Sequence, residues 1–315
     1  MTTLAQKSPR VKKKKSSTAQ TLPLLLIALP GMVYLLINNY LPMFGVFLAF
    51  KDYSYVKGIF GSKWNGLDNF EFLFKTKDAW TMTRNTLLYN AAFIILGTIF
   101  AIFVAILIHE LGKKRRVKLF QASLMLPNLL SWVVVGFIVY AFLNADNGFI
   151  NNTICKAFGL EPVSWYSNKG PWPYILVFVY LWKFVGTNSI IYVAGIAGID
   201  QEIFEAAQLD GASKVKQIIH ITVPMLKPTI ITLTLMAIGR IFYSDFGLFY
   251  QVPANSGRLF DVTQTIDTYV YRGLMERNDV GMAAAAALYQ SVVGFLLVVV
   301  ANGLVRKIDK ENALF

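Results

Sequence analysis

Residues 85–111 read NTLLYNAAFIILGTIFAIFVAILIHEL, with no lysine, arginine or aspartate and a single glutamate at Glu110. A helix needs about 20 mainly apolar residues to cross the ~30 Å hydrocarbon core of a bilayer. This stretch is long enough, and it stays uncharged until its last turn. It therefore predicts a membrane-spanning helix, and the rest of the chain repeats the pattern.

Five further apolar runs predict an all-α, polytopic membrane protein with about six transmembrane helices. The expected spans are 22–50, 85–111, 120–143, 174–199, 225–250 and 282–305. Pro23, Pro30 and Pro42 predict kinks in the first run, which is too long for the apolar core of a cleaved signal sequence. The expected domains are a basic cytoplasmic tail, 1–20, and one membrane domain, 21–315.

The composition supports this class and excludes others. Of the 315 residues, 55% are hydrophobic and 15% charged, whereas soluble domains carry about a quarter charged residues. The net charge of +12 does not indicate nucleic-acid binding, because the basic residues gather at the ends of the apolar runs. Cys155 is the single cysteine, so no disulfide framework or thiolate metal site is expected. His109 and His220 are interpreted as solvated side chains near helix ends.

The distribution of lysine and arginine predicts the orientation in the membrane. With the N-terminus inside, the inner segments are 1–20, 112–119, 200–228 and 306–315, and the outer segments are 51–84, 144–173 and 251–281. The inner segments are about twice as rich in these residues, as the positive-inside rule requires. The first outer loop is itself basic, which weakens the asymmetry without reversing it. Both termini are therefore expected in the cytoplasm.

The longest structured inner segment is 200–224, DQEIFEAAQLDGASKVKQIIHITVP. Asp200 is placed to cap a short helix, and Gly211 permits a corner that other residues resist. Ser213 is placed to cap a second helix, which Pro224 is expected to end. The second helix is expected to keep Gln217 off its apolar face, which consists of Val215, Ile218, Ile219 and Thr222. The segment is thus predicted to form a helix–turn–helix at the inner membrane surface.

These residues resemble the EAA loop of permease subunits of ATP-binding-cassette (ABC) importers. The family pattern is Glu-Ala-Ala, three residues, Gly, nine residues, Ile, one residue, Leu-Pro. The residues assigned to ATPase coupling by the resemblance are Glu205, Ala206, Ala207, Asp210, Gly211, Ile221 and Pro224. The chain departs from the pattern once, with Val223 in place of leucine.

The resemblance extends over most of the chain, through residues 24–52, 64–70, 182–200 and 240–247, and is nearest to permeases for oligosaccharides and polysaccharide fragments. It implies a second homologous permease subunit, two ATPase subunits and an extracytoplasmic solute-binding protein in a bacterial cytoplasmic membrane. It also implies that ATP and Mg bind the ATPase subunits. This chain has no G-x-x-x-x-G-K-[ST] phosphate loop, so it is expected to be neither an enzyme nor the holder of a cofactor.

Polar and aromatic side chains inside the spans are candidates for an oligosaccharide pathway. Charges at membrane depth are costly and usually face a bundle interior or an aqueous cavity, which singles out Lys183, Arg240 and Asp245. Side chains that suit sugar hydroxyls and ring faces are Tyr180, Trp182, Asn188, Tyr192, Tyr243, Tyr289 and Gln290. Structural pairing is the alternative for the charged residues and is favoured for Asp245. Packing or anchoring at the membrane interface is the alternative for the aromatic residues.

Other functions remain open at this point. An ion-coupled secondary carrier would explain the spans, but it would leave the pattern in 200–224 without a role, and such carriers often show two related halves. A permease of the same superfamily for amino acids would share that pattern. A membrane receptor or scaffold is disfavoured because the loops leave no room for a large soluble domain.

Overall fold

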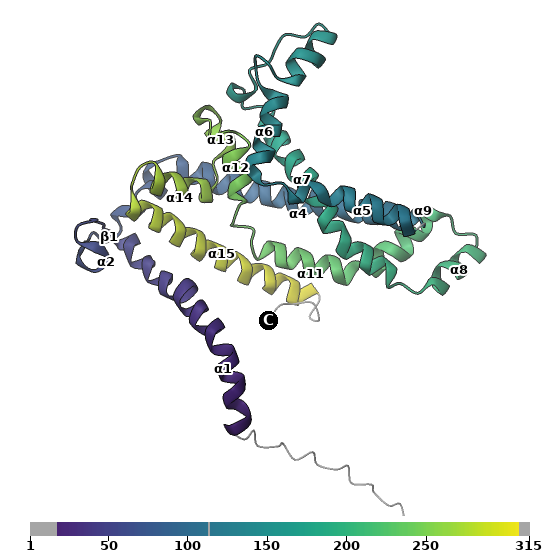
Figure 1. Cartoon of the computed structure of the whole chain (residues 1–315), viewed down its shortest axis with the longest axis horizontal. Helices are drawn as coiled ribbons and strands as arrows, with labels where there is room; N and C mark the ends of the chain where they lie inside the picture. Colours follow the sequence, from purple (N-terminus) through teal and green to yellow (C-terminus); the bar gives the residue numbers. More distant parts are fainter. Residues whose placement is uncertain (1–17, 113, 309–315) are drawn as a thin grey trace, which may run out of the picture. The chain divides into compact units, whose positions relative to one another are not determined.

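The computed structural model describes residues 18–112 and 114–308, which are almost entirely helical (Figure 1). The basic run 12–15, most of the expected tail 1–20 and residues 309–315 lie outside this description. The chain divides into two units, residues 1–47 and 48–315. The all-α prediction is confirmed, and one two-stranded hairpin is present among the described residues.

The described part of the first unit is a lone apolar helix. It begins as α1 (Thr18–Leu35), continues as the π-helical turn η1 (Leu36–Tyr40) and tightens into the 3₁₀ helix η2 (Leu41–Phe50), which runs on into the second unit. Every side chain from Leu22 to Phe44 is exposed. A helix that is apolar all round needs lipid or another protein around it, so this helix suits the first expected span, 22–50.

Three long helices of the second unit match expected spans: α4 (Asp78–Glu110), α7 (Trp172–Ala197) and α15 (Val280–Ile308). Each has the length and hydropathy to cross a membrane. Helices α4 and α7 pack along each other (Figure 1). On α4 the small residues Ala101 and Ala105 are buried, a spacing of four that places them on one face and allows close helix approach.

The remaining elements are shorter. Before α4 come β1 (Lys51–Asp52), α2 (Gly58–Gly61), β2 (Lys63–Trp64), η3 (Asp68–Phe70) and α3 (Phe72–Lys75). Between α4 and α7 come α5 (Lys114–Leu129), α6 (Trp132–Leu143), η4 (Ile150–Cys155) and η5 (Trp165–Ser167). After α7 come α8 (Gln201–Leu209), α9 (Lys214–Gln217), η6 (Ile218–Thr222), α10 (Val223–Met225), α11 (Lys227–Ile238), α12 (Phe246–Gln251), η7 (Gly257–Leu259), α13 (Phe260–Thr263) and α14 (Ile266–Met275). Strands β1 and β2 pair antiparallel, with Lys51 opposite Trp64.

The expected span 120–143 is not one continuous helix, which corrects the sequence prediction. Helix α5 ends at Leu129 and α6 begins at Trp132, and their axes differ by 94°. Pro127 removes one backbone donor from the last turn of α5. Ser131 then starts a new helix, because its hydroxyl accepts a hydrogen bond from the Val134 amide at 3.3 Å.

The expected span 225–250 is also broken. Helix α11 ends at Ile238, a non-helical turn follows, and α12 begins only after Asp245. Asp245 forces this restart because its carboxylate accepts hydrogen bonds from the Gly247 and Leu248 amides at 3.1 and 3.4 Å. Both breaks expose backbone polar groups, which must find partners inside the protein.

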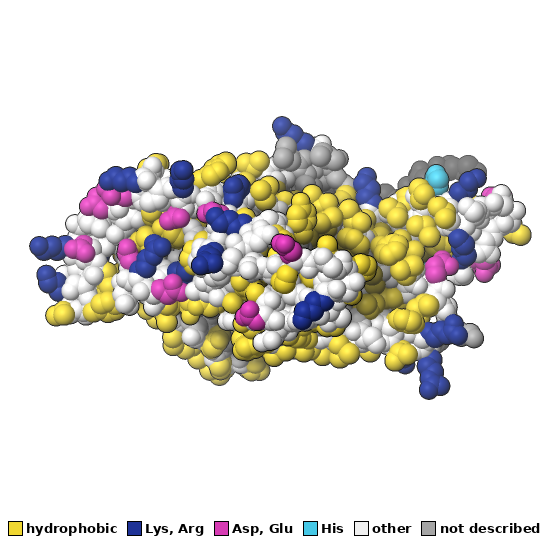
Figure 2. All heavy atoms as spheres, turned by 90° about the horizontal axis from the view of Figure 1, so that it is seen from above, with side chains coloured by type: hydrophobic (Ala, Val, Ile, Leu, Met, Phe, Trp, Pro, Cys, Tyr) yellow, Lys and Arg dark blue, Asp and Glu magenta, His cyan; other side chains and the backbone are white. Residues whose placement is uncertain are grey.

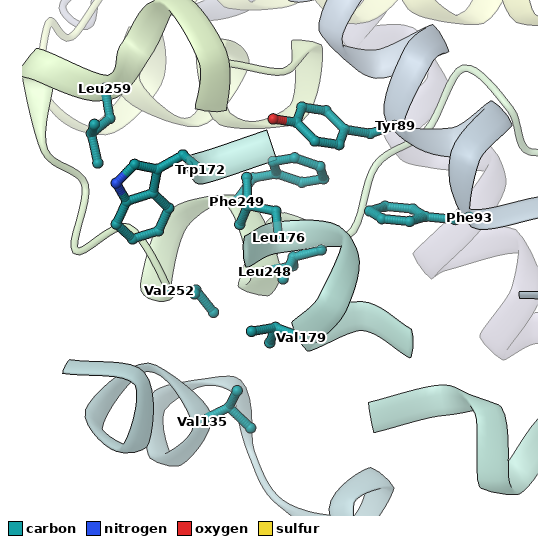
Figure 3. Packing of buried hydrophobic residues seen from close by; sticks show 10 residues of the cluster. All are labelled: Tyr89, Phe93, Val135, Trp172, Leu176, Val179, Leu248, Phe249, Val252 and Leu259. Atoms are coloured by element: carbon teal, nitrogen blue, oxygen red, sulfur yellow. The ribbon is translucent and has the colours of Figure 1, made fainter. Parts of the chain in front are cut away.

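The largest buried cluster joins α4, α6, α7 and α12 (Figure 3). It consists of Tyr89, Phe93, Val135, Trp172, Leu176, Val179, Leu248, Phe249, Val252 and Leu259. Two glycines set the helix spacing nearby. A Cβ on Gly186 of α7 would lie 2.0 Å from the Leu124 carbonyl oxygen of α5, and one on Gly247 would lie 2.0 Å from the Trp132 ring. These contacts hold the broken spans against the rest of the second unit.

Apolar side chains also cover much of the surface. Figure 2 shows wide hydrophobic areas between groups of charged side chains. On α4 the exposed residues include Leu88, Ile95, Ile99, Phe103 and Leu107. They lie on the side opposite the buried small residues, as expected for a helix that faces lipid on one side and protein on the other.

Candidate solute pathway and coupling segment

Two adjoining cavities lie between α4, α7, α11 and the turn before α12. The larger, of about 510 Å³, is lined by Asn90, Phe93, Ile94, Tyr180, Phe184, Ala237, Arg240, Tyr243, Ser244, Asp245 and Phe246. The smaller, of about 200 Å³, is lined by Phe93, Ile94, Gly97, Thr98, Ala101, Tyr180, Asn188, Ile191, Tyr192, Leu233 and Ala237. The two share Phe93, Ile94, Tyr180 and Ala237. They are therefore neighbours along the helices, and the two together are called the hollow.

The predicted pathway residues Asn188, Arg240, Tyr243 and Asp245 line this hollow. Sequence reasoning placed Arg240 in the middle of a span, whereas the structure places it in the turn after α11, exposed toward the larger cavity. Among the described residues its guanidinium has no hydrogen-bond or ion-pair partner. Asp245 has a structural role as the N-cap of α12 and faces the same cavity.

An aromatic wall completes the cavity. The rings of Phe93 and Tyr180 stack with centroids 3.8 Å apart and planes within 10°, and Tyr180 also contacts Phe184 at 4.8 Å. Flat aromatic faces suit the C–H surfaces of sugar rings, while the hydroxyls of Tyr180 and Tyr243 and the amide of Asn188 suit sugar hydroxyls. The hollow therefore combines the two kinds of contact that a carbohydrate needs.

Lys183 lies elsewhere, although sequence reasoning placed it with the pathway. It is buried and lines neither cavity. Its ammonium donates to the carbonyl oxygens of Pro127 and Asn128, each at 3.2 Å, and to that of Leu130. It also lies 5.0 Å from the centroid of the Trp132 ring. Lys183 thus satisfies the last carbonyls of α5 at the break before α6, a structural role.

Three further candidates also lie outside the hollow. Trp182 lines a separate, apolar cavity of about 600 Å³ formed with α6. The Tyr289 hydroxyl lies 3.1 Å from that of Thr83. Gln290 is buried and donates to the Phe242 carbonyl at 2.8 Å. Because helices present side chains in all directions, depth in a span could not tell these residues from cavity residues.

The turn at residues 239–245 is held by residues that sequence reasoning missed. From α4, the Asn90 amide donates to the carbonyls of Ile241 and Tyr243 at 2.9 and 3.0 Å. From α14, the Asp267 carboxylate accepts from the backbone amide and the hydroxyl of Ser244, each at 2.7 Å. These bonds satisfy the backbone of a non-helical turn and fix the side of the turn that faces the cavity. The signal that could have found Asn90 is its amide inside an otherwise apolar run.

The segment 200–224 has the predicted caps and corner. The Asp200 carboxylate accepts from the Glu202 amide at 3.0 Å and begins α8. Gly211 has φ of +75°, the left-handed conformation that favours glycine. The Ser213 hydroxyl accepts from the Lys216 amide at 3.4 Å and begins α9. These local features are confirmed.

The second half of the segment differs from expectation in two ways. Pro224 does not end the helix, because it lies in the first turn of α10, where no N–H is required. The helical path continues to Met225 and bends by 56° before α11. Gln217 is buried, donating to the Ala212 carbonyl at 3.1 Å, while Val215 and Ile219 are exposed. The hydrogen bond from the Gln217 side chain to the backbone, and not the apolar pattern, thus decides which side of this helix is buried.

The remaining coupling candidates present an exposed surface. Glu205, Ala206 and Asp210 are exposed, Ala207 and Ile221 are half-buried, and Leu209 is 90% exposed. Among the described residues the Glu205 carboxylate has no hydrogen-bond or ion-pair partner. The segment is tied to the membrane helices by the ion pair of Lys214 with Glu110 at 3.2 Å. A free carboxylate beside small and apolar side chains suits contact with another protein.

Comparison with known proteins decides the family. The family described as binding-protein-dependent transport system inner membrane component matches residues 97–310. The chain belongs to this family. It is therefore a multi-pass bacterial membrane protein and a permease component of a binding-protein-dependent transport system. Membership sets aside the secondary-carrier alternative.

Individual relatives of this permease align over nearly its whole length. Protein LplB of Bacillus subtilis (strain 168) is 34% identical over 92% of this chain and 90% of its own. The polygalacturonan/rhamnogalacturonan transport system permease protein YteP of the same organism is 32% identical over 92% of this chain and 89% of its own. A solved bacterial ABC transporter involved in import of the acidic polysaccharide alginate contains a chain with a TM-score of 0.83 and 29% identity. The match covers 92% of this permease and 97% of that chain.

Proposed function

We propose that this permease forms half of the translocation pathway of an ATP-driven importer for oligosaccharides. A second homologous permease forms the other half, two ATPase subunits bind on the cytoplasmic side, and an extracytoplasmic solute-binding protein delivers the sugar. The observation that carries the proposal is the match, over 92% of the chain, to a chain of an alginate importer. A second solved match is that transporter in complex with a periplasmic protein bound to an alginate pentasaccharide.

The cavity gives this proposal its chemistry. Sugar rings stack on the half-buried ring of Tyr180, which Phe93 supports from its other face. Sugar hydroxyls bind Asn188, Tyr243 and Asp245 as the solute passes between α4, α7 and α11. The larger cavity, of about 510 Å³, lies within the ~300–1,000 Å³ range of small-molecule sites. Its aromatic and polar lining supports a carbohydrate over an amino acid.

Residues 200–224 are proposed to be the coupling element. ATP is hydrolysed on other subunits, so the work must cross a protein interface. Glu205 offers a charge to the ATPase subunit, Ala206 and Ala207 allow close approach, and Gly211 holds the corner. With residues 200–224 on the cytoplasmic side of the membrane, both chain termini also lie in the cytoplasm.

ATP-dependent uptake by the reconstituted complex tests the proposal. The purified permeases and ATPase subunits are placed in liposomes with the binding protein outside and ATP inside, and uptake of an oligosaccharide that the binding protein accepts is measured. Uptake is expected with ATP and Mg, and not with a non-hydrolysable ATP analogue. An ionophore that collapses ion gradients should leave it unchanged. Uptake that needs the ion gradient and persists without ATP would refute the proposal.

A further inference from the structure

Arg240 is exposed toward the larger cavity, and it differs from the buried and half-buried cations of the second unit. Lys183 binds three carbonyls, and Arg272 binds Asn255 at 3.1 Å and Gln264 at 3.0 Å. Arg84 binds Asn85 and the Asp261 carbonyl. In the part of the chain that the structure describes, the Arg240 side chain has no such partner, and it is the only cation lining the two cavities. A cation left unpaired in a membrane domain usually marks a functional site.

The acid in the same cavity is not paired with Arg240. Asp245 forms no ion pair with it among the described residues. The Asp245 carboxylate instead accepts hydrogen bonds from two backbone amides at the start of α12. Arg240 and Asp245 thus face the same cavity as separate charges of opposite sign, and the donors of the guanidinium stay available to a ligand.

The position of Arg240 is fixed by its neighbours in the turn. Gly239 ends α11, and the backbone amides of Arg240 and Tyr243 close turns onto the carbonyls of Ala237 and Arg240 at 3.0 and 2.9 Å. The next carbonyls along the chain are held by Asn90, as described above. A guanidinium carried on a fixed backbone can select an anion by geometry as well as charge.

We infer that Arg240 binds the carboxylate of an acidic sugar, which makes uronate-containing oligosaccharides the substrate class of this pathway. This inference rests on the proposed function. The planar guanidinium donates two parallel hydrogen bonds to a carboxylate, while the sugar ring that carries the carboxylate packs on the half-buried ring of Tyr180, which is stacked on Phe93. Asp245, on the same cavity wall, accepts hydroxyl hydrogens and repels a carboxylate that enters in the wrong orientation. The site thus prefers one orientation of an anionic sugar.

The test compares trigalacturonate with the neutral maltotriose in the reconstituted complex, using wild type, Arg240→Gln and Arg240→Lys. The ratio of acidic to neutral uptake is expected to fall at least about tenfold in Arg240→Gln, since a site built to hydrogen-bond a group discriminates strongly for it. Arg240→Lys should recover part of the ratio, because it keeps the charge and loses the two-pronged geometry. Equal loss of both sugars, as expected if Arg240 pairs with an acid of the partner permease, would overturn the inference.

A second readout avoids the binding protein. Trigalacturonate at low salt should raise the melting temperature of the purified wild-type complex and leave that of Arg240→Gln unchanged. An equal shift in both would overturn the inference. Wild-type complex that imports maltotriose with ATP and neither imports nor binds trigalacturonate would also overturn it, while the permease function stands. Absence of ATP-dependent uptake for every sugar that the binding protein accepts would instead count against the proposed function.

Discussion

Replacing Lys183 by methionine should destabilise the membrane domain without acting on the solute directly. Methionine keeps most of the side-chain length but removes the donor for the carbonyls of Pro127, Asn128 and Leu130. Each buried carbonyl left without a partner costs about 1–3 kcal/mol. The Pro127 carbonyl keeps the Leu130 amide as a donor at 3.3 Å. Taking the low end for the other two carbonyls gives about 2 kcal/mol, a factor of roughly 30 in the folding equilibrium.

The measurement is the melting temperature of the purified permease complex in detergent. A loss of about 2 kcal/mol corresponds to a drop of about 4 °C or more for a domain of a few hundred residues. Lys227→Met is the matched control, because Lys227 is exposed at the start of α11, and it should change the melting temperature by less than about 1 °C. If Lys183→Met melts with the wild type, the ammonium does not hold the break between α5 and α6, and the structural role given to it here is wrong.

Three further changes have defined outcomes. Gly186→Ala should lower the melting temperature, because the added Cβ would overlap helix α5. Gly97 has open space around it, so Gly97→Ala should leave the melting temperature unchanged or slightly higher. Equal effects of the two changes would contradict the close packing of Gly186 on α5. Asp267→Ala should reduce uptake at least about tenfold by releasing the turn at 239–245. Asp267→Asn keeps an acceptor and should recover part of the uptake. Full uptake by the alanine variant would show that Asp267 does not hold the turn. Single cysteines placed at Ser17 and Glu311 in a cysteine-free chain should resist an impermeant thiol reagent in intact cells. Labelling of both would show that the termini lie outside and that the proposed orientation is wrong.

The sequence was sufficient for the parts of the fold that depend on local composition. Apolar length located the helices α4, α7 and α15 to within about two turns. The caps and corner at Asp200, Gly211 and Ser213 were equally predictable, because each depends on one residue and its immediate neighbours. These are interactions that need no knowledge of the rest of the chain.

The two breaks depend on distant residues and could not be predicted in the same way. Pro127 and Gly239 occur where a helix in a membrane could have continued. The bent conformation at the first break is satisfied by Lys183, more than 50 positions away. At the second it is satisfied by Asp267 and Asn90, on helices α14 and α4. Hydropathy records how apolar a stretch is, and not which partners will satisfy its backbone.

The candidate site shows the same division. Residue type selected Asn188, Arg240, Tyr243 and Asp245 as pathway candidates, and these four line the cavities, although a structural role was favoured for Asp245. It selected Lys183 and Gln290 as well, because a buried polar group that holds a backbone looks the same in sequence as one that binds a solute. The distinction lies in where the helix turns each side chain, and that is fixed by tertiary packing.

The most direct test of the account is whether residues 200–224 transmit ATP hydrolysis to solute movement. Gly211 has φ of +75° and open space around it, so Gly211→Val strains the corner by roughly 1–3 kcal/mol without a clash. Ala212→Val, one residue on and without a positive φ, is the matched control, and Glu205→Lys reverses the exposed charge.

Binding-protein-stimulated ATPase activity and oligosaccharide uptake are measured in the same proteoliposomes. Gly211→Val and Glu205→Lys are predicted to lose the stimulation of ATPase activity, the uptake of oligosaccharide, or the dependence of uptake on ATP hydrolysis. The permeases should still assemble in both variants, and Ala212→Val should behave as the wild type. Normal stimulation and normal uptake in both test variants would contradict it.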